Sequence, residues 1–179
     1  MTALQMPERA APGAAEMEFA ALVRQHQAMV FSVAWQFLRD RALAEELAQD
    51  VFLSLHQHLA TLESPAHVLH WLRRVAVNRA LDVARRRQRR PMVSLQDAPE
   101  PVAVNSTGDP MLGSALRRLV AALPEKARMI VILRYQEDLD PTEIAGILGI
   151  PVGTVKSQLQ RALTLLREKL SRRLGEISL

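Results

Sequence analysis

Residues 139–170 read LDPTEIAGILGIPVGTVKSQLQRALTLLREKL, and this stretch decides the fold of the C-terminal half. Asp140 can cap a helix, with a proline in the first turn and a glutamate three residues on that completes a capping box. Gly149 suits the left-handed residue that ends such a helix. A longer helix is expected to begin near Val152 or Gly153. Two helices joined by a short glycine-bearing turn predict a helix-turn-helix.

The helix after this turn has an apolar side and a polar side. At about 100° per residue, its apolar residues lie within roughly 60° of the direction of Leu159. The opposite side and its flanks carry Thr154, Lys156, Ser157, Gln158, Gln160 and Arg161. Hydroxyl, amide and basic groups on one helix surface suit base edges and phosphates, which predicts a recognition helix for the major groove. On these features alone, a purely structural helical hairpin is the alternative.

The N-terminal half predicts three further helices. Apolar residues recur at three- and four-residue intervals over about 17–38, and at every fourth residue over about 42–59. A third helix is expected to follow Ser64 and Pro65 and to run to about Arg90, because serine caps helices and proline is tolerated in their first turn. The inward stripes of these helices predict a three-helix core.

The third of these helices is strongly basic at its C-terminal end. Residues 71–90 carry eight arginines and one aspartate, a net charge of +7 in a chain whose whole net charge is +4. Guanidinium groups bind phosphate bidentately and stack on bases, so this density predicts contact with nucleic acid. A solvated basic helix is one alternative. A helix lying on a membrane surface is another, although the inward stripe here is narrow and rich in alanine.

The helix before it carries a second polar face, formed by Glu45, Glu46, Gln49 and Asp50. Charged faces on helices are usually solvated surface, and that is one interpretation here. A docking face for another protein is the other.

The two halves are joined by PMVSLQDAPEPVAVNSTGDPML, residues 91–112, which holds four of the ten prolines and no lysine or arginine. This composition predicts a flexible linker. We therefore expect a disordered tail at 1–15, a first domain at 16–90, the linker at 91–112 and a second domain at 113–179. The predicted fold class is all-α, with two small helical domains joined by the linker.

Composition also excludes several function classes. The chain has no cysteine, which excludes disulfides, thiolate metal sites and iron–sulfur clusters. No cysteine joins the pairs His56/His58 and His67/His70, so we expect neither a metal site nor a cofactor. Phosphate-binding glycine loops and paired catalytic carboxylates are missing, so an enzyme is not expected. No stretch is long and apolar enough to span a membrane, and the first residues do not resemble a signal peptide, so a cytoplasmic protein is expected.

Four stretches, taken in order, resemble the ECF (extracytoplasmic function) sigma factors of bacterial RNA polymerase, within the sigma-70 family. They are AEELAQDVF at 44–52, WLRRVAVNRALDVARR at 71–86, LPEKAR at 123–128 and EIAGILGIPVGTVKS at 143–157. The resemblance implies a non-catalytic factor that binds core RNA polymerase and directs promoter-specific initiation. It also implies three partners: core polymerase, promoter DNA and an anti-sigma factor that occludes the polymerase-docking face.

The resemblance assigns roles to three groups of residues. Docking on polymerase falls to Glu45, Glu46, Leu47, Gln49, Asp50 and Phe52. Contact with the promoter −10 element falls to Arg73, Arg74, Asn78, Arg79, Asp82, Arg85 and Arg86. Contact with the −35 element falls to Thr154, Lys156, Ser157, Gln158, Gln160 and Arg161. The loop of about Thr61 to Pro65 would, by similarity, hold an extruded base of the non-template strand.

The chain departs from the family pattern at a few of these positions. Arg73 stands where an aromatic residue is common, and Gln158 stands where arginine is common. The second departure weakens the expected grip on phosphate near the −35 element. Two alternatives to a sigma factor remain: a stand-alone helix-turn-helix regulator that binds DNA as a dimer, and an interaction module that binds polymerase without DNA specificity.

Overall fold

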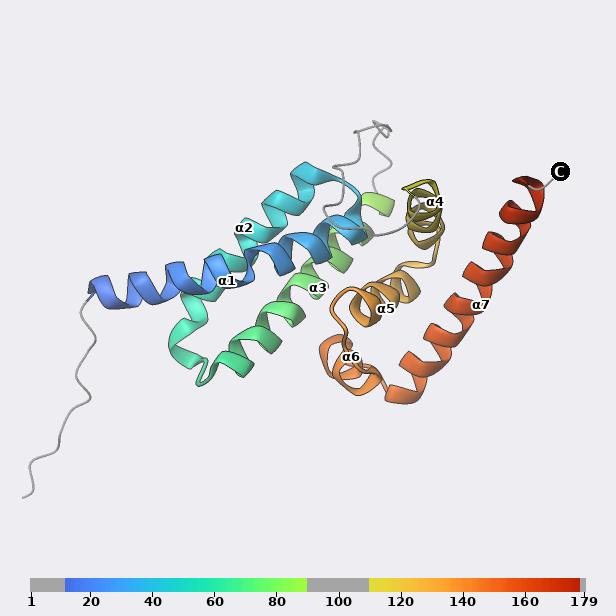
Figure 1. Cartoon of the computed structure of the whole chain (residues 1–179). Coiled ribbons are helices and arrows are strands. Elements are labelled where there is room, and N and C mark those ends of the chain that lie inside the picture. The colour runs from blue at the N-terminus through green and yellow to red at the C-terminus, as the bar shows by residue number, and fades with distance from the viewer. Residues whose placement is uncertain (1–11, 90–109, 178–179) are drawn as a thin grey trace, which may run out of the picture.

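The computed structural model describes residues 12–89 and 110–177 (Figure 1). Those residues form seven α-helices and one short 3-10 helix and contain no strand, which confirms the predicted all-α fold. The helices are α1 (Pro12–Leu38), α2 (Arg41–His58), η1 (Leu59–Thr61), α3 (Pro65–Arg89), α4 (Pro110–Ala121), α5 (Glu125–Tyr135), α6 (Pro141–Leu148) and α7 (Val152–Ile177). None of the helices in this described part combines the length and apolarity needed to cross a membrane.

The predicted tail and linker lie mainly outside the described residues, which omit 1–11 and 90–109. At both boundaries the helices extend further than expected from the sequence. Helix α1 begins at Pro12, so the last four residues of the expected tail are helical. Helix α4 begins at Pro110, so the last three residues of the expected linker are helical too.

Local signals explain where the helices begin and end. Asp40 caps α2 by accepting a hydrogen bond from the backbone N–H of Leu43 at 3.1 Å. Asp140 accepts from the N–H of Glu143 at 2.9 Å, and the Glu143 carboxylate accepts from the N–H of Asp140 at 2.8 Å. The predicted capping box of α6 is therefore confirmed. Gly149 ends α6 with φ of +63°, the left-handed conformation that glycine adopts without strain.

Helices α1, α2 and α3 pack side by side and bury a common apolar core (Figure 1). Phe37 of α1, Leu55 of α2 and Leu72 of α3 are all at most 1% exposed. These residues belong to the inward stripes that the spacing of apolar residues predicts. The three-helix organisation of the N-terminal half is therefore as expected.

In the C-terminal half, α5 and α6 lie between α3 and α7, and α4 rests on α5 and α7 (Figure 1). Helices α6 and α7 form the predicted helix-turn-helix, with Ile144 and Val155 fully buried at their junction. A separate small cluster that includes Leu119, Leu123 and Leu166 attaches α4 to this unit.

The two halves share one hydrophobic core. Helix α5 packs on α1 and α3, and α6 packs on α3. One continuous cluster contains Phe37 and Leu72 from the first half together with Ile130, Leu133 and Ile144 from the second. The division of the chain into two domains stays a prediction, and the periodicity of the sequence does not predict that the two groups of helices are packed together.

Candidate nucleic-acid interface

Helix α3 presents one exposed polar face. At about 100° per residue, Arg74, Asn78 and Arg85 point within about 40° of one another. All three side chains are exposed, and Asp82 and Arg86 beside them are exposed as well. Asp82 accepts a hydrogen bond from Arg85 at 3.1 Å, which holds this guanidinium along the helix. The result is a ridge of guanidinium and amide groups that can bind phosphates and base edges.

Arg79 points away from that ridge, toward α2. Its Nη1 donates to the Asp50 carboxylate at 2.9 Å, and its Nη2 donates to the Ser54 hydroxyl at 2.6 Å. An open hollow of about 500 Å³ beside this contact is lined by Glu46, Asp50, Arg79, Asp82 and Arg86, among others. The structure thus brings residues from the expected polymerase-docking and −10 groups into one place.

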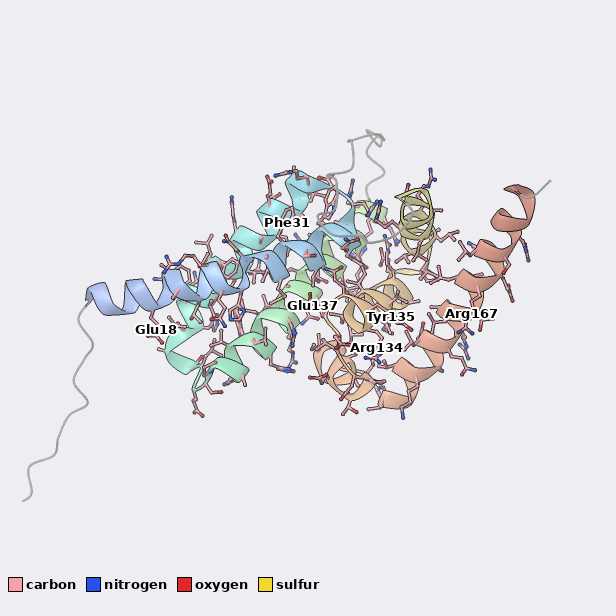
Figure 2. The ribbon with its side chains drawn as sticks, in the orientation of Figure 1. Glu18, Phe31, Arg134, Tyr135, Glu137 and Arg167 are labelled. Atoms are coloured by element: carbon pink, nitrogen blue, oxygen red, sulfur yellow. The ribbon has the colours of Figure 1, made fainter. Side chains whose placement is uncertain are left out.

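Arg73 lies apart from the other members of the −10 group. Its direction differs from that of Arg74 by about 100°, and it faces the C-terminal half. Arg73 Nη2 lies 3.5 Å from Glu137 Oε2, and the two side chains are 19% and 10% exposed. Figure 2 places Glu137 where the two halves meet. In this arrangement Arg73 does not belong to the exposed face of α3.

Burial perturbs two titratable groups around Arg73. Desolvation raises the pKa of Glu137, and the charge of Arg73 offsets part of that rise. On α1, His26 is 8% exposed. Burial lowers the pKa of His26, and the nearby positive charge of Arg73 lowers it further. The site therefore favours a neutral imidazole beside the guanidinium.

The polar side of α7 faces away from the helices on which α7 packs, which are α4, α5 and α6. Lys156, Gln160 and Arg161 are exposed, whereas Thr154, Ser157 and Gln158 are half-buried. The Ser157 hydroxyl donates to the backbone carbonyl of Thr154 at 3.1 Å. This N-terminal part of α7 therefore presents side chains of mixed polarity, as a helix that enters the major groove does.

The expected polymerase-docking group separates into surface and core. Glu45, Glu46, Gln49 and Asp50 are exposed on α2. Leu47 and Phe52, by contrast, are 4% and 9% exposed and belong to the shared hydrophobic cluster. Leu47 nevertheless lines the open hollow beside Arg79, and Phe52 lines the groove between α1 and α2, so their roles in docking stay predictions.

Sequence reasoning missed an apolar groove between α1 and α2. The groove has a volume of about 830 Å³ and is lined by Phe19, Val23, Gln27, Ala28, Phe31, Glu45, Ala48, Gln49, Phe52 and Leu53. Leu53 is 64% exposed there. Leu53 lies off the inward stripe of α2, but a single exposed leucine is ordinary on a protein surface, so no distinct sequence signal marks the groove.

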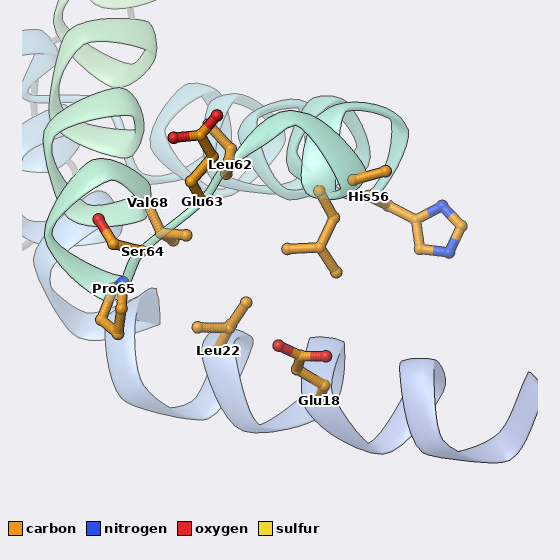
Figure 3. A pocket seen from close by; sticks show the side chains of 10 residues that line it. Glu18, Leu22, His56, Leu62, Glu63, Ser64, Pro65 and Val68 are labelled. Carbon is orange, nitrogen blue, oxygen red and sulfur yellow. The ribbon is translucent and has the colours of Figure 1, made fainter. Parts of the chain in front are cut away.

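The loop before α3 borders a cavity of about 580 Å³ (Figure 3). It is lined by Glu18, Leu22, His56, Leu59, Ala60, Leu62, Glu63, Ser64, Pro65 and Val68. Ser64 accepts a hydrogen bond from the N–H of His67 at 3.2 Å and so caps α3, as expected. The loop that the resemblance associates with an extruded base thus borders a concave surface, and Glu18 and Glu63 are among the residues that line it.

Two family descriptions match the chain. "Sigma-70 region 2" matches residues 22–90, and "Sigma-70, region 4" matches residues 114–166. The first range contains the exposed polar face of α3 and the exposed acidic face of α2. The second contains the helix-turn-helix.

Curated relatives cover most of the chain. The ECF RNA polymerase sigma factor SigM of Mycobacterium tuberculosis is 32% identical over 160 residues, which are 89% of this chain and 79% of SigM. The ECF RNA polymerase sigma factor SigE of Mycolicibacterium smegmatis is 32% identical over 161 residues. This chain spans 62% of the length of that SigE, and 44% of the "Probable RNA polymerase sigma factor RfaY" of Xanthomonas campestris pv. campestris, which is 29% identical.

Solved structures share the fold. The sigma factor RpoE of Bartonella quintana, solved in complex with the anti-sigma factor NepR, superposes with a TM-score of 0.69 at 23% identity. The match covers 86% of this chain and 97% of RpoE. It therefore includes helices from both halves.

Proposed function

Because the chain belongs to the ECF sigma factors of the sigma-70 family, we propose that it binds core RNA polymerase and directs promoter-specific transcription initiation. The observation that carries this proposal is one chain with two distinct polar helix surfaces, the face of α3 and the N-terminal part of α7. Neither surface needs a bound group or a reaction to act. The role is binding, and the chemistry of transcription belongs to the polymerase.

The −10 element is the proposed ligand of the α3 face. Arg74, Asn78 and Arg85 are exposed and aligned, so they can contact consecutive phosphates and bases of one strand. Opening a duplex and extruding a base costs a few kcal/mol, which binding must supply. The concave loop before α3, at about Thr61 to Pro65, is the proposed place for that base. Asp82 and Arg86 border the same face.

The −35 element is the proposed ligand of α7. Lys156 and Arg161 supply charge for phosphates, while Gln158 and Gln160 can donate to and accept from base edges. Thr154 and Ser157 lie nearer the start of the helix, and their hydroxyls suit close backbone contacts. Duplex recognition is therefore assigned to the helix-turn-helix.

Polymerase docking is proposed for α2. Glu45, Glu46, Gln49 and Asp50 give an exposed acidic surface that complements a basic partner. The apolar groove beside them adds buried area through Phe31 and Leu53. Once α2 is held on polymerase, binding of the second promoter element becomes effectively intramolecular.

We also propose an anti-sigma factor as a partner. An RpoE of the same fold was solved with the anti-sigma factor NepR. In this chain the groove between α1 and α2 is mainly apolar and open, so a helix that covered it would also block the acidic docking surface. One partner would then prevent the other from binding.

Transcription in vitro tests the proposed function. The purified chain is added to core polymerase with fragmented genomic DNA, and the 5′ ends of the transcripts are sequenced. We expect discrete start sites that share −10 and −35 motifs and that disappear when the chain is omitted. Matched reactions with Arg74→Gln should lose these transcripts. Tight binding of the chain alone to a palindrome, without polymerase-dependent starts, would instead support the stand-alone regulator.

A further inference from the structure

Two arginines cross the interface between the halves. Arg73 of α3 lies 3.5 Å from the carboxylate of Glu137, which follows α5. Arg128 of α5 donates to the backbone carbonyl of Phe37 at 3.1 Å, and its guanidinium carbon lies 4.7 Å from the centre of the Phe37 ring. Both contacts border the shared apolar core, so separation of the halves breaks both.

Neither guanidinium is fully satisfied at this interface. The Nε atoms of Arg73 and Arg128 are buried and have no hydrogen-bond partner among the described residues. A buried donor without a partner weakens the folded arrangement, and a buried ion pair often fails to recover its desolvation cost. Burial is the largest cause of the raised pKa of Glu137, so the charged carboxylate is also disfavoured at this interface. The polar contacts therefore favour separation, while the apolar contacts oppose it.

We propose that Arg73 has two alternative partners: Glu137 when the halves are packed together, and promoter DNA when they are apart. The proposal rests on the proposed function, because it takes the −10 element as the second partner. Closure and DNA binding then compete for one guanidinium. Arg74 and Arg85 remain exposed in the packed form, whereas Arg73 is largely covered beside Glu137. Of these three arginines, only Arg73 therefore becomes available to DNA when the halves separate.

The dimensions of a promoter require the halves to separate. Packed helix axes lie about 8–10 Å apart, so α3 and α7, with α6 between them, are within about 20 Å. Elements centred about 25 base pairs apart are about 85 Å apart on duplex DNA, at about 3.4 Å per pair. The packed form therefore cannot reach both elements at once.

A pair of single substitutions tests the competition in the free chain. Glu137→Gln leaves Arg73 buried without its carboxylate, so we expect about a tenfold larger open fraction. Apparent affinity for a single-stranded −10 oligonucleotide should rise by up to the same factor, because Arg73 is available to DNA only in the open form. Asp138→Asn is the matched control, because its side chain is 100% exposed on the same turn. The control should change both quantities less than about twofold.

The open fraction can be measured by single-molecule energy transfer. The chain has no cysteine, so Ala42→Cys and Thr164→Cys, both exposed, give two specific labelling sites on α2 and α7. Circular dichroism verifies that each variant keeps its helices. Equal open fractions in the wild type and Glu137→Gln would overturn the proposal.

Two further variants separate competition from simple structural support. Arg73→Gln should open the chain as Glu137→Gln does, yet without tighter DNA binding, because the phosphate contact is lost as well. The double variant Arg73→Met/Glu137→Leu replaces the pair by apolar side chains and should lower the open fraction below that of the wild type. If the double variant opens the chain as far as the single variants, or if Arg73→Gln binds DNA as tightly as Glu137→Gln, the proposal is wrong.

These measurements use the chain without polymerase, so they do not depend on the outcome of the transcription assay. A failed transcription assay with an intact effect of Glu137→Gln on closure would reject the proposed function and leave the interface contact standing. The reverse result would reject the shared role of Arg73 alone.

Discussion

Arg79 of α3 is bound to Asp50 of α2, with 2.9 Å between Nη1 and the carboxylate oxygen. The helix proposed to contact polymerase is therefore connected directly to the helix proposed to contact DNA. Ser54 fixes the other end of the guanidinium at 2.6 Å. Polymerase that binds Asp50 would compete with Arg79 for this carboxylate.

Asp50→Asn should weaken binding to core polymerase by about tenfold while leaving folding nearly unchanged. The side chains of Arg79 and Asp50 are 39% and 52% exposed, and exposed pairs contribute only about 0–1 kcal/mol to stability. Fluorescence anisotropy with labelled chain measures the affinity, and thermal unfolding measures stability. Glu168→Gln is the control, because it also removes one negative charge from an exposed side chain, on α7. This variant should leave polymerase affinity unchanged.

Arg74→Gln and Arg85→Gln should weaken binding to the −10 strand and make it less dependent on salt. Each lost phosphate contact lowers the slope of log K against log salt by about 0.7 on single-stranded DNA. Titrations at several salt concentrations give that slope. Arg87 lies on the same helix but points about 140° away from Arg74 and pairs with Asp40 at 3.4 Å, so Arg87→Gln is the comparison. An equal change of slope in Arg87→Gln would contradict a specific role for the exposed face.

Gln158→Ala and Lys156→Gln should affect −35 binding in different ways. An amide that contacts a base edge contributes about 1–3 kcal/mol of discrimination at one base pair, so Gln158→Ala should relax preference at one position. Lys156→Gln should weaken binding to all sequences about equally, since phosphates carry no sequence information. Binding to a library of −35 variants distinguishes the two outcomes. Uniform loss in both variants would mean that α7 does not read bases through Gln158.

Folding stability should fall as the pH drops below about 6.5, because of His26. Its pKa is lowered in the folded chain from 6.5, so the unfolded chain binds more protons in the window below that value. Glu137 acts in the opposite direction at lower pH, because its pKa is raised above 4.5 and the folded form binds the extra proton. Urea unfolding between pH 7.5 and 5.5 measures the sum.

His26→Gln should flatten this pH dependence, and Glu137→Gln should make the acid loss steeper. His67, exposed on α3, supplies the control substitution His67→Gln. A wild-type curve that remains flat down to pH 5.5, or one that His26→Gln does not alter, would exclude His26 as the cause.

Gly149→Ala should destabilise the C-terminal half by about 1–2 kcal/mol. The backbone at Gly149 has φ of +63°, and a side chain in that conformation is strained even though no atom lies within 4 Å of the place that a Cβ would take. Gly153→Ala is the matched test in the first turn of α7, where the space is equally open and the backbone is helical. That variant should be neutral or slightly stabilising, because alanine favours helix. Denaturant unfolding of both variants gives the comparison.

Helix positions and caps could be predicted because they depend on local spacing. The capping box at Asp140, the glycine end of α6 and the start of α3 at Pro65 all follow from residues within four positions of one another. The polar side of α7 could be predicted for the same reason. Such local patterns predict the direction in which a side chain points from its own helix.

The contact between the halves could not be predicted in this way. Apolar residues such as Leu133 and Ile144 contribute to a core that includes both halves. Their periodicity shows that they are buried, but it does not show which helices bury them. The same limit explains Arg73, which belongs to a basic run in the sequence but lies at the interface in the structure. Only the packing of α5 and α6 on α3 separates it from its neighbours in the run.

The shared core also affects the stability of the chain after the proposed separation of its two halves. When α5 and α6 leave α3, side chains such as Ile130 and Leu133 lose part of their cover and meet water. Under the proposed opening, a molecule released after initiation would expose apolar surface and be open to proteases until its halves pack together again. The supply of chains for a further round of initiation would then depend on the rate of that closure.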